Sequence, residues 1–560
     1  MQDLARLRED LAVRWQGLKD ERSPWLTTWR DISDYICPDR GRFGSPSDTN
    51  DGQRNDSLII DDSARLAHRN FASGMRSGLT NPAHPWFKLV TPGDPEKSDF
   101  PELRAWLDHV RTVLMRIFAK SNAYSAFQAT YSECGAFGTH AFLIEPDFET
   151  VIRVRPFTIG EFVLGTDGKN HVSVLGREFS MTALQMVTEY GLDNVSESVK
   201  DAYRQGNSRQ RFDLVQMILP NEWREQGKAT SKNLPFLSVH WDPGDRAGRF
   251  LRTSGYKYFP AITPRWSVVS DDVYSKGSPG WFALGNAKMI QQLQTDCLTA
   301  IQKVIDPPLQ APASLMQQYG LSTVPGGINY VPDTNQAGIR SIYDGRPDIE
   351  AIEAKIQRVG VNVERAFFSD LFLMLTNLDR NQMTATEVAE RHEEKLLMLG
   401  PVLEQLYNEM LDPVIDQTFS RALDAGILPP PPPDLQGEEI KAEYVSVLAQ
   451  AQRMVGTAAI EQTMAFAGNL LAAFPEVRHK IDALAALQKY GTYVGVPAEI
   501  LRTTDEALAR IEQEARQIRA QQAMEQVQSG AQSAKILSDT PVGQSTAMDM
   551  LLGGITGNAP

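Results

Sequence analysis

The sequence predicts a mixed α/β (α+β) protein that is mainly helical, with a β-rich region inserted between helical segments. Apolar residues recur at three- and four-residue steps over much of the chain, which is the period of an amphipathic helix. Between about 140 and 270, short β-branched and aromatic runs replace this period, which is typical of strands. The length of 560 residues also exceeds one core, and about 100–200 residues per domain predicts three or four units.

The composition excludes several classes of protein. The formal net charge of −14 argues against a protein that holds nucleic acid by neutralising phosphates, because such binding needs a basic surface. It does not exclude a surface past which DNA moves without sticking. The three cysteines lie far apart and predict neither a disulfide framework nor a zinc site. The charged N-terminus is unlike a signal peptide, and the apolar run MAFAGNLLAAF is too short to span a membrane.

Two helices are predicted at the N-terminus. An apolar stripe from Leu4 to Leu18 marks the first. Ser23-Pro24 predicts the start of the second, because serine suits the N-cap and proline the first helical position. Trp25 and Trp29 then belong to a buried face, and we expect them in the core rather than at a partner site.

Helices around 60–78 and 101–137 precede the β-rich region. Within that region, Asp167-Gly168 is a turn signal between two strands, and one short helix is predicted near 181–190. The predicted strands are HAFLIEP, VIRVRPF, EFVLGTDG and HVSVLGREF, followed by strand-like runs at 211–223, 236–243 and 256–269.

After Gly280 the helical period returns in two segments with matching apolar stripes. The first ends at Pro307 and Pro308, because proline lacks the amide hydrogen and its ring clashes with the preceding turn. Residues 306–349 hold several prolines and glycines, and matching stripes on either side predict an antiparallel helix pair. The stripes are Met289, Leu293, Cys297, Ile301 and Val304 on the first helix, and Ile352, Ile356, Val359, Val363 and Phe367 on the second.

The last third is predicted to be helical with interruptions. Thr384 and Glu387 have capping-box spacing and open a helix that continues beyond Pro401 to about 425. The proline run in GILPPPPPD is a stiff spacer, and 438–500 is helical and Ala-rich. A final helix starts at Thr503–Glu506, and the tail from about 528 is expected to be loosely ordered.

No motif in the sequence points to catalysis. The patterns GxxxxGK[ST], HExxH and GxSxG are missing, and GTDGKN at 165–170 is better explained as a β-turn. His392 beside two glutamates is expected on a solvated helix face. We therefore predict no catalytic residue, no metal and no cofactor. Structural or surface roles are expected for His68, His84, His140, His171 and His240, which lack ligand spacing.

Six stretches occur in a fixed order over nearly 450 residues. They are RWQGLKDERSPWLTTWRDISDYICPDRGRF, ASGMRSGLTNPAHPWFKL, YSKGSPGWFALGNAKMIQQLQ, IDPPLQAP, MTATEVAERHEEKLLMLGPVLEQLYNEMLDPVI, and GILPPPPPDL with AEYVSVLAQAQR. Together they resemble the head-to-tail connector, or portal, proteins of podovirus-type bacteriophages. Two departures are Lys276-Gly277 in place of a Gly-Arg pair, and His84 where a basic residue is common. The sequence after about 500 matches no pattern of the family.

The resemblance implies a ring-forming structural protein without catalytic activity. The ring, usually a dodecamer, sits in the virion at one capsid vertex, and its channel passes double-stranded DNA during packaging and ejection. The implied partners are the terminase large subunit, a tail adaptor or head completion protein, the major capsid protein and the scaffolding protein. Synthesis in the cytoplasm of the bacterial host and no membrane partner are also implied.

The family's order of parts also carries over onto the chain. It implies a wing at 1–280, with the β-rich region inside it, stem helices at 281–305 and 350–368, and a clip at 306–349. A tunnel loop is implied at 369–383, a wing helix at 384–428, a crown at 429–500, and a C-terminal helix with a flexible tail at 501–560.

Individual residues follow from these assignments as expectations. The tunnel loop, which could equally be an ordinary connection between helices, is expected to present Asn377, Arg380, Asn381 and Gln382 to DNA. Partner docking is expected in the clip, at Gln317, Gln318, Tyr319, Tyr330 and Asn335. Structural roles are expected for Ser278, Pro279, Gly280, Pro307, Pro308, Thr384 and Glu387.

Two other classes of function remain open at the level of sequence. One is a capsid or tail-assembly structural protein without a DNA tunnel. The other is a hydrolase such as a packaging ATPase or nuclease, against which the missing phosphate-binding loop weighs. The order of helix, excursion and helix favours the connector over the tunnel-free protein.

Overall fold

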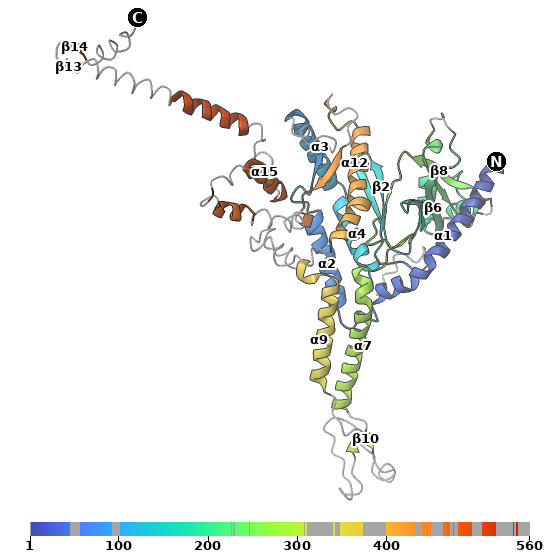
Figure 1. Ribbon diagram of the computed structural model, residues 1–560. Helices are drawn as coiled ribbons and strands as arrows, with labels where there is room; N and C mark the ends of the chain where they lie inside the picture. Colours follow the sequence, from blue (N-terminus) through green and yellow to red (C-terminus); the bar gives the residue numbers. More distant parts are fainter. Residues whose placement is uncertain are drawn as a thin grey trace, which may run out of the picture. The chain divides into compact units, whose positions relative to one another are not determined.

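The chain divides into two units, Met1–Val455 and Gly456–Pro560. In the computed structural model the first unit contains both helices and antiparallel sheets (Figure 1). The structure describes residues 2–44, 56–91, 101–225, 227, 230–245, 247–306, 309–310, 340–341, 348–372, 399–432, 440–446, 448–449, 463–470, 474, 480–494, 507–521, 541–542 and 545–546.

The N-terminal segment is one helix, α1 (Gln2–Tyr35), with Pro24 inside it. The prediction of two helices divided at Ser23-Pro24 is therefore wrong. A proline inside a helix costs about 3 kcal/mol, whereas burying one large apolar side chain contributes about 1.5–3 kcal/mol. Both halves of α1 bury such side chains, because Trp15 lies in the core of a sheet and Trp29 packs on Tyr274 with ring centroids 5.2 Å apart. Trp29 is fully buried, as expected for a core residue, whereas Trp25 is only partly buried.

Three further helices follow, with a short strand after the first of them. The predicted helical stretch 101–137 is divided at Ser121-Asn122 into two helices, the second of which is almost wholly buried. The elements are α2 (Ser63–Leu79), β1 (Phe87–Val90), α3 (Pro101–Lys120) and α4 (Ala123–Phe137).

The β-rich region forms two antiparallel sheets, which confirms the mixed α+β class. A three-stranded sheet has the order β3 (Val151–Phe157), β2 (Ala141–Asp147), β9 (Ala261–Ile262). The turn predicted at Asp167-Gly168 joins the first two strands of the larger sheet. That five-stranded sheet has the order β4 (Phe162–Thr166), β5 (Val172–Thr182), β6 (Arg211–Pro220), β7 (Phe236–Trp241), β8 (Phe250–Tyr256).

The predicted strand at 256–269 is mostly wrong. The strand in this part of the chain is β8, which ends at Tyr256 and pairs with β7, and only the two-residue β9 follows. Beyond β9 the pairing continues only as an isolated bridge between Thr139 and Arg265. Pro260 and Pro264 lack the amide hydrogen that a continuous strand would donate.

Helices cover both faces of the five-stranded sheet. On one face Leu11 and Trp15 of α1 pack with Val215, Met217 and Val239 of the sheet. The other face is covered by α5 (Ala183–Tyr190), which was predicted, and α6 (Glu197–Arg204), which was not. Successive residues of β6 point to opposite faces, as the period of a strand requires.

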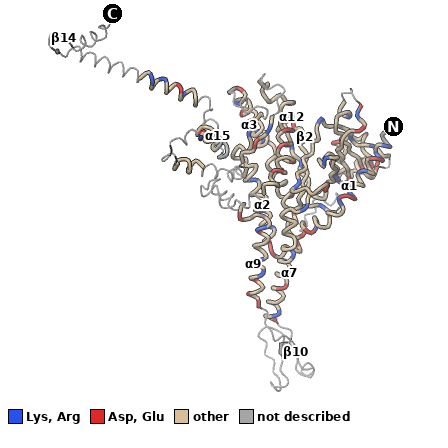
Figure 2. The backbone as a smooth tube through the Cα atoms, viewed as in Figure 1, with Lys and Arg blue, Asp and Glu red and all other residues tan. Residues whose placement is uncertain are grey.

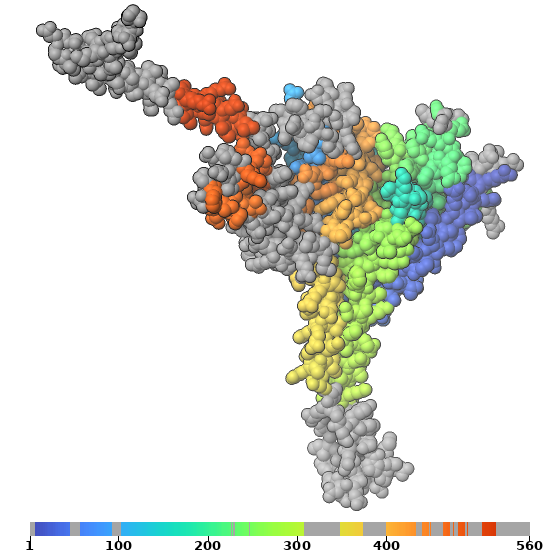
Figure 3. Space-filling model, in the orientation of Figure 1, coloured from blue at the N-terminus to red at the C-terminus, as the bar shows by residue number. Residues whose placement is uncertain are grey.

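A helical hairpin, formed by α7 (Pro279–Ile305) and α9 (Ile349–Ala366), is the next part of the chain (Figure 1). The two helices run antiparallel and pack against each other, as the matching stripes predicted. The space-filling view in Figure 3 shows them side by side. The stripe of α9 is buried or partly buried throughout, but Met289 and Val304 of the α7 stripe are exposed. The predicted stripe of α7 is therefore only partly buried within the described chain.

A helix and a strand lie near the C-terminal end of the first unit. Residues 399–406 are helical and continue through a π-helical turn, η4 (Tyr407–Leu411), into α12 (Asp412–Asp424), so the helix passes Pro401 as predicted. The chain then forms β12 (Lys441–Tyr444), which pairs antiparallel with β1. The expectation of helix throughout 438–500 is wrong here, because β1 offers a strand partner and Tyr444 stacks on Trp86 with ring centroids 6.4 Å apart.

Most described residues of the second unit are helical, and one strand pair is also present. Residues 463–470 and 507–521 are helical, as is α15 (Ala483–Val494), in agreement with the predicted helical character. A short pair, β13 (Pro541–Val542) with β14 (Ser545–Thr546), lies in the tail. None of the described helices is both long and apolar enough to cross a membrane.

Candidate functional site

The candidate site is the helical hairpin and the joint that holds it to the rest of the first unit. Ser278 is the N-cap of α7 and Pro279 its first residue. The Ser278 hydroxyl donates to the carbonyl of Ala136 at the end of α4 (2.8 Å) and accepts from the amide of Trp281 (3.4 Å). One side chain thus starts α7 and ties it to α4.

Gly280 allows the backbones of α7 and α4 to approach closely. A Cβ atom at position 280 would lie 2.9 Å from the carbonyl carbon of Ala136 and closer still to its oxygen. Real Cβ atoms do not approach backbone atoms this closely. The Ser-Pro-Gly sequence is therefore both a helix start and a helix–helix joint.

A second tie holds the middle of α7. The side-chain oxygen of Gln291, a buried residue, accepts from the amides of Ile60 (2.7 Å) and Asp61 (2.9 Å). Its side-chain nitrogen donates back to the carbonyl of Asp61 (2.9 Å). Lys288, one turn earlier, pairs with Asp31 of α1 at 2.6 Å. The hairpin is thus bonded to α1 and to the segment that precedes α2.

An aromatic cluster holds the other helix of the hairpin at its base. Phe71 of α2 packs against Phe367 and Phe372, with ring centroids 6.1 and 5.3 Å away. Gly74 lies under the ring of Phe372, where a larger residue would not fit. The chain turns between the two phenylalanines at Phe368, whose φ of 52° is uncommon for a residue other than glycine. This turn lets residues on both sides of the end of α9 reach α2.

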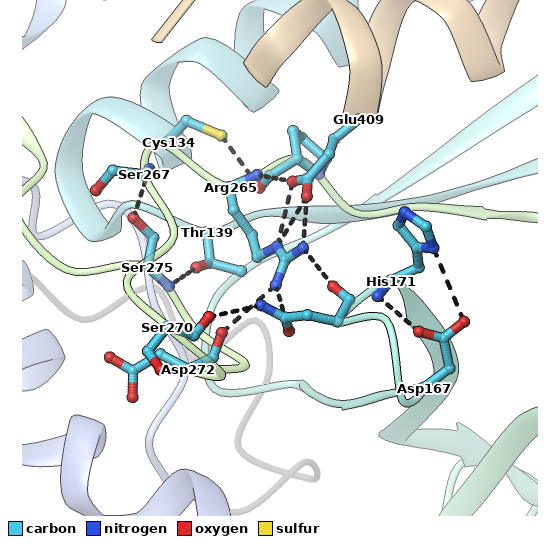
Figure 4. A network of polar contacts seen from close by, with 12 residues as sticks. Cys134, Thr139, Asp167, His171, Arg265, Ser267, Ser270, Asp272, Ser275 and Glu409 are labelled. Atoms are coloured by element: carbon cyan, nitrogen blue, oxygen red, sulfur yellow. Dashed lines mark hydrogen bonds and ion pairs between the residues drawn. The ribbon is translucent and has the colours of Figure 1, made fainter. Parts of the chain in front are cut away.

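The loop that precedes α7 is fixed by a buried ion pair (Figure 4). The Arg265 guanidinium, 3% exposed, contacts the Glu409 carboxylate at 2.5 Å and donates to the carbonyl of Asn170 (3.0 Å). Glu409 also accepts from the backbone amide of Arg265 (2.9 Å). Because Glu409 lies in the π-helical turn η4, this pair joins the β4–β5 turn, the loop before α7 and the helix that becomes α12. Turns of this kind are frequent at functional sites.

A buried carboxylate holds the loop after α1. Glu133 of α4 is fully buried, accepts from the hydroxyl of Thr158 (2.7 Å) and the amide of Ile159 (3.2 Å), and lies 3.6 Å from Arg40. Burial raises the pKa of Glu133 to about 7, and the positive charge of Arg40 opposes this rise. The group therefore titrates near neutral pH in the folded protein.

We expect Glu133 to make stability fall as pH rises from about 4.5 to about 7, since its pKa is higher in the folded than in the unfolded chain. The folded state binds the proton more tightly in this window, so stability is greatest below it and level above it. Glu133→Gln should remove this dependence, which is on the order of 3 kcal/mol. Thermal unfolding of both proteins at pH 5 and pH 8 measures it. An equal melting-temperature difference at both pH values would contradict the assignment.

The histidines for which the sequence predicted structural or surface roles are either buried and hydrogen-bonded or packed, or exposed. His68 donates to the carbonyl of Ser132 (2.8 Å), and His240 contacts the hydroxyl of Tyr190 (2.8 Å). Burial lowers the pKa of His68 to about 4 and that of His140 to about 3, so both are neutral at pH 7. His84 and His171 are exposed. Among the described residues, no group of three or more His, Cys, Asp or Glu could hold a metal ion.

The surface of α7 carries apolar side chains that the chain itself leaves uncovered. With about 100° per residue, Phe282 lies about 100° to one side of Ala283 in the buried row, whereas Leu298 points nearly in the direction of Ala287 but lies farther along the helix. Phe282 is 71% and Leu298 49% exposed. Two exposed apolar places on one helix, one beside the packed row and one farther along the helix, each leave room for a neighbouring molecule. Met289 accompanies Phe282, and Ile305 accompanies Leu298.

Charges along the hairpin are mixed in sign (Figure 2). The described part of α9 alternates acidic and basic residues, among them Glu353, Lys355, Arg358, Glu364 and Arg365. A surface of this kind offers no continuous basic stripe to a DNA backbone over the residues that the structure describes. Beyond the helices, β10 (Leu309–Gln310) pairs with β11 (Arg340–Ser341), so the excursion between them begins and ends in adjacent strands.

The other residues that the sequence singled out lie outside the described residues. They are the expected tunnel residues Asn377, Arg380, Asn381 and Gln382, the expected docking residues Gln317, Gln318, Tyr319, Tyr330 and Asn335, and Pro307, Pro308, Thr384 and Glu387. Sequence reasoning in turn missed Arg265, Glu409, Glu133 and Gln291, since the partners of each lie far away in the chain.

Comparison with known proteins identifies the family to which the chain with this helical hairpin belongs. Residues 8–501 match the family model described as bacteriophage head to tail connecting protein. Two curated relatives are each 39% identical over 542 residues, 97% of this chain and 97% of theirs. They are the probable portal protein of Bordetella phage BPP-1 and the portal protein of Salmonella phage epsilon15.

Two solved structures are more distantly similar, both at 12% sequence identity. The virion of a native gene transfer agent particle gives a TM-score of 0.33, with 76% of this chain and 94% of that chain covered. The neck of an empty gene transfer agent particle gives 0.30, with 72% and 90% covered. The assignment to a family therefore comes from the sequence matches.

These matches define a structural protein of the bacteriophage particle. The chain belongs to the family of bacteriophage head-to-tail connecting proteins, as its sequence motifs indicated. It is a virion protein of the portal class, whose role is to connect the head of the phage to the tail.

Proposed function

We propose that copies of this connector assemble into a closed ring, usually a dodecamer, around a channel for double-stranded DNA. The observation that carries the proposal is the pair of exposed apolar patches on α7, one at Phe282 and the other at Leu298. Two different patches on one molecule can form a head-to-tail contact with neighbouring copies, and such contacts give a closed ring when the rotation between copies closes.

The channel is proposed to pass DNA without holding it. A net charge of −14 per chain repels the duplex, and the mixed charges of the hairpin leave few places for phosphates to bind. Each retained phosphate-binding cation would add a salt-dependent hold and slow the transit of DNA. We propose the loop 369–383, with Asn377, Arg380, Asn381 and Gln382, as the part nearest to DNA.

The remaining parts are proposed to dock the partners of a connector. The proposed parts are those of the family order: wing 1–280, stem helices 281–305 and 350–368, clip 306–349, wing helix 384–428, crown 429–500 and tail 501–560. The clip, with Gln317, Gln318, Tyr319, Tyr330 and Asn335, is proposed to bind the terminase large subunit during packaging and the tail adaptor afterwards. The major capsid and scaffolding proteins are proposed to contact the rest of the ring.

The ring is tested by native mass spectrometry and negative-stain electron microscopy of the purified protein. We expect rings with a central hole. Phe282→Glu and Leu298→Glu should each lower the association constant by tenfold or more, because burying such a side chain contributes about 1.5–3 kcal/mol. Thr299→Glu is the matched control, since this exposed residue lies on the side of α7 away from the buried row.

Two results would overturn the proposal. Monomers at several salt concentrations, or closed particles without a hole, would favour a capsid or tail-assembly protein without a tunnel. Hydrolysis of ATP by the purified chain alone would favour a packaging enzyme. We expect no hydrolysis above a blank without protein.

A further inference from the structure

A row of polar side chains crosses the five-stranded sheet on one face. Arg177 of β5 lies opposite Gln216 of β6. Gln216 in turn lies opposite His240 of β7, and His240 lies opposite Arg252 of β8. Residues directly opposite each other on neighbouring strands point to the same face of a sheet. Leu214, two residues before Gln216 on β6, packs with α5 and α6, so the row lies on the face that these helices cover.

Arg177 is held firmly within this row. Its side chain is 7% exposed, and its Nε atom donates to the side-chain oxygen of Gln216 at 2.6 Å. Its guanidinium lies over the rings of Phe157 and Phe179, 4.8 and 4.2 Å from their centroids. Contacts of this kind between a cation and an aromatic face are favourable and orient the planar group. Burial lowers the pKa of Arg177 to about 10, so the side chain is charged at neutral pH.

The two terminal nitrogens of Arg177, which we call its fork, have no hydrogen-bond partner among the residues that the structure describes. The carboxylates of Glu145 and Glu161 act on its charge from farther away. Glu145 pairs instead with Arg155, at 3.0 Å. Glu161 pairs instead with Arg42, at 3.2 Å. A buried cation without an anion of its own is costly, so the fork is a place where an anion would be stabilising.

Two other arginines show how the chain satisfies such a group elsewhere. Arg22, which is also buried, donates to two backbone carbonyls at 2.8 and 2.7 Å. Arg14 lies over the ring of Trp223, much as Arg177 lies over its two rings. The fork of Arg14, however, binds both carboxylate oxygens of Glu222, at 3.0 Å each. Arg177 thus has the stacked geometry of Arg14 without the carboxylate.

The charges around the fork also favour an anion. Burial, and then the positive charges of Arg177, Arg252 and Arg155, lower the pKa of His240 to about 3. His240 is therefore neutral at pH 7, and its surroundings are positive. Arg155 and Arg252 each have a carboxylate partner, at 3.0 and 2.9 Å. The charge that remains uncompensated in this row is that of Arg177.

We infer that the fork of Arg177 binds a small oxyanion, either a carboxylate or a phosphate. Two parallel N–H···O bonds from one guanidinium match the oxygens of both groups. The small exposed fraction of Arg177 favours a free ion over an acidic side chain of a partner protein, because little of the fork is open to a protein surface. Binding here does not depend on ring formation, since every group involved belongs to one copy of the chain.

Equilibrium dialysis of the full-length protein tests the site. Phosphate and acetate are dialysed in separate experiments, with the ionic strength held constant by sodium chloride. We expect each chain to bind one anion, and the anion that binds more tightly identifies the class of ligand. Arg177→Met should lower the affinity by about tenfold or more. Arg14→Met is the matched control and should bind as the unsubstituted protein does, because the fork of Arg14 already holds Glu222.

Arg177→Lys separates binding from folding. Lysine keeps the positive charge but not the planar fork, so this variant should fold and should bind the anion about tenfold more weakly. Unchanged affinity in Arg177→Lys would overturn binding through the fork. No binding of either anion at millimolar concentrations, or equal binding by Arg177→Met and the unsubstituted protein, would overturn the site itself. Each of these results leaves the ring proposal untouched, because dialysis reads binding in single chains and rings alike.

Discussion

Replacing Arg265 with methionine should lower the free energy of unfolding of the first unit by about 3–5 kcal/mol, because it leaves the Glu409 carboxylate without its buried partner. Arg265 is almost fully buried and joins three segments of the chain through Glu409 and Asn170. Removing one member of such a pair costs more than the pair contributes, since the other charge, here Glu409 with 19% of its side chain exposed, is left mostly buried and unpaired. Chemical denaturation, followed by tryptophan fluorescence, measures the loss.

An exposed ion pair is the matched control for Arg265. Lys257 and Asp424 lie 3.5 Å apart with side chains 63% and 62% exposed. Lys257→Met should change stability by only about 0–1 kcal/mol. The double variant Arg265→Met with Glu409→Met should be more stable than Arg265→Met alone, because it leaves no unpaired charge. A single variant as stable as the Lys257 control would show that the pair does not hold the loop before α7.

Gly280→Ala should destabilise the first unit by about 1–3 kcal/mol, the cost of overpacking a close contact. The added methyl group would meet the backbone of Ala136, which cannot move aside as a flexible side chain can. The hairpin would then shift away from α4, and the bond from Ser278 to Ala136 would lengthen. Thermal unfolding measures the loss of stability.

Gly285, on the same helix, is the control for this substitution. Nothing lies within 4 Å of a Cβ atom at this position. Gly285→Ala should therefore stabilise the protein by up to about 1 kcal/mol, the difference in helix propensity between the two residues. If both substitutions raised the melting temperature, the close approach of α7 to α4 would be disproved.

Elements that depend on local pattern were predictable from the sequence. The stripe from Ile352 to Phe367 predicted α9, and the turn at Asp167-Gly168 lies between β4 and β5 as expected. Elements that depend on contacts with residues far away in the chain were not predictable from the sequence. Proline at position 24 is a local signal for a helix start, but the core contacts of Trp15 and Trp29 keep α1 continuous.

In the candidate site, too, the local features were predictable from the sequence and the long-range contacts were not. Ser278, Pro279 and Gly280 were identifiable because a helix start has a local sequence signature. Their contact with Ala136 was not, since it depends on how α4 and α7 pack. Arg265 and Glu409 are 144 residues apart, and neither stands in a recognisable motif. Only a three-dimensional structure brings them together.

The pairing of β1 with β12 constrains when this protein can finish folding. Phe87 lies opposite Tyr444, so the two strands are separated by about 350 residues of chain. On the ribosome β1 emerges long before its partner exists, and until then its backbone groups and Trp86 lack the contacts that β12 supplies. Closing so long a loop is also slow, because its entropy must be lost before the contact stabilises anything. Nascent chains stalled before residue 441 should therefore leave open the edge of β1 and the face of Trp86 that Tyr444 covers, which would make this edge a natural place for a chaperone to bind.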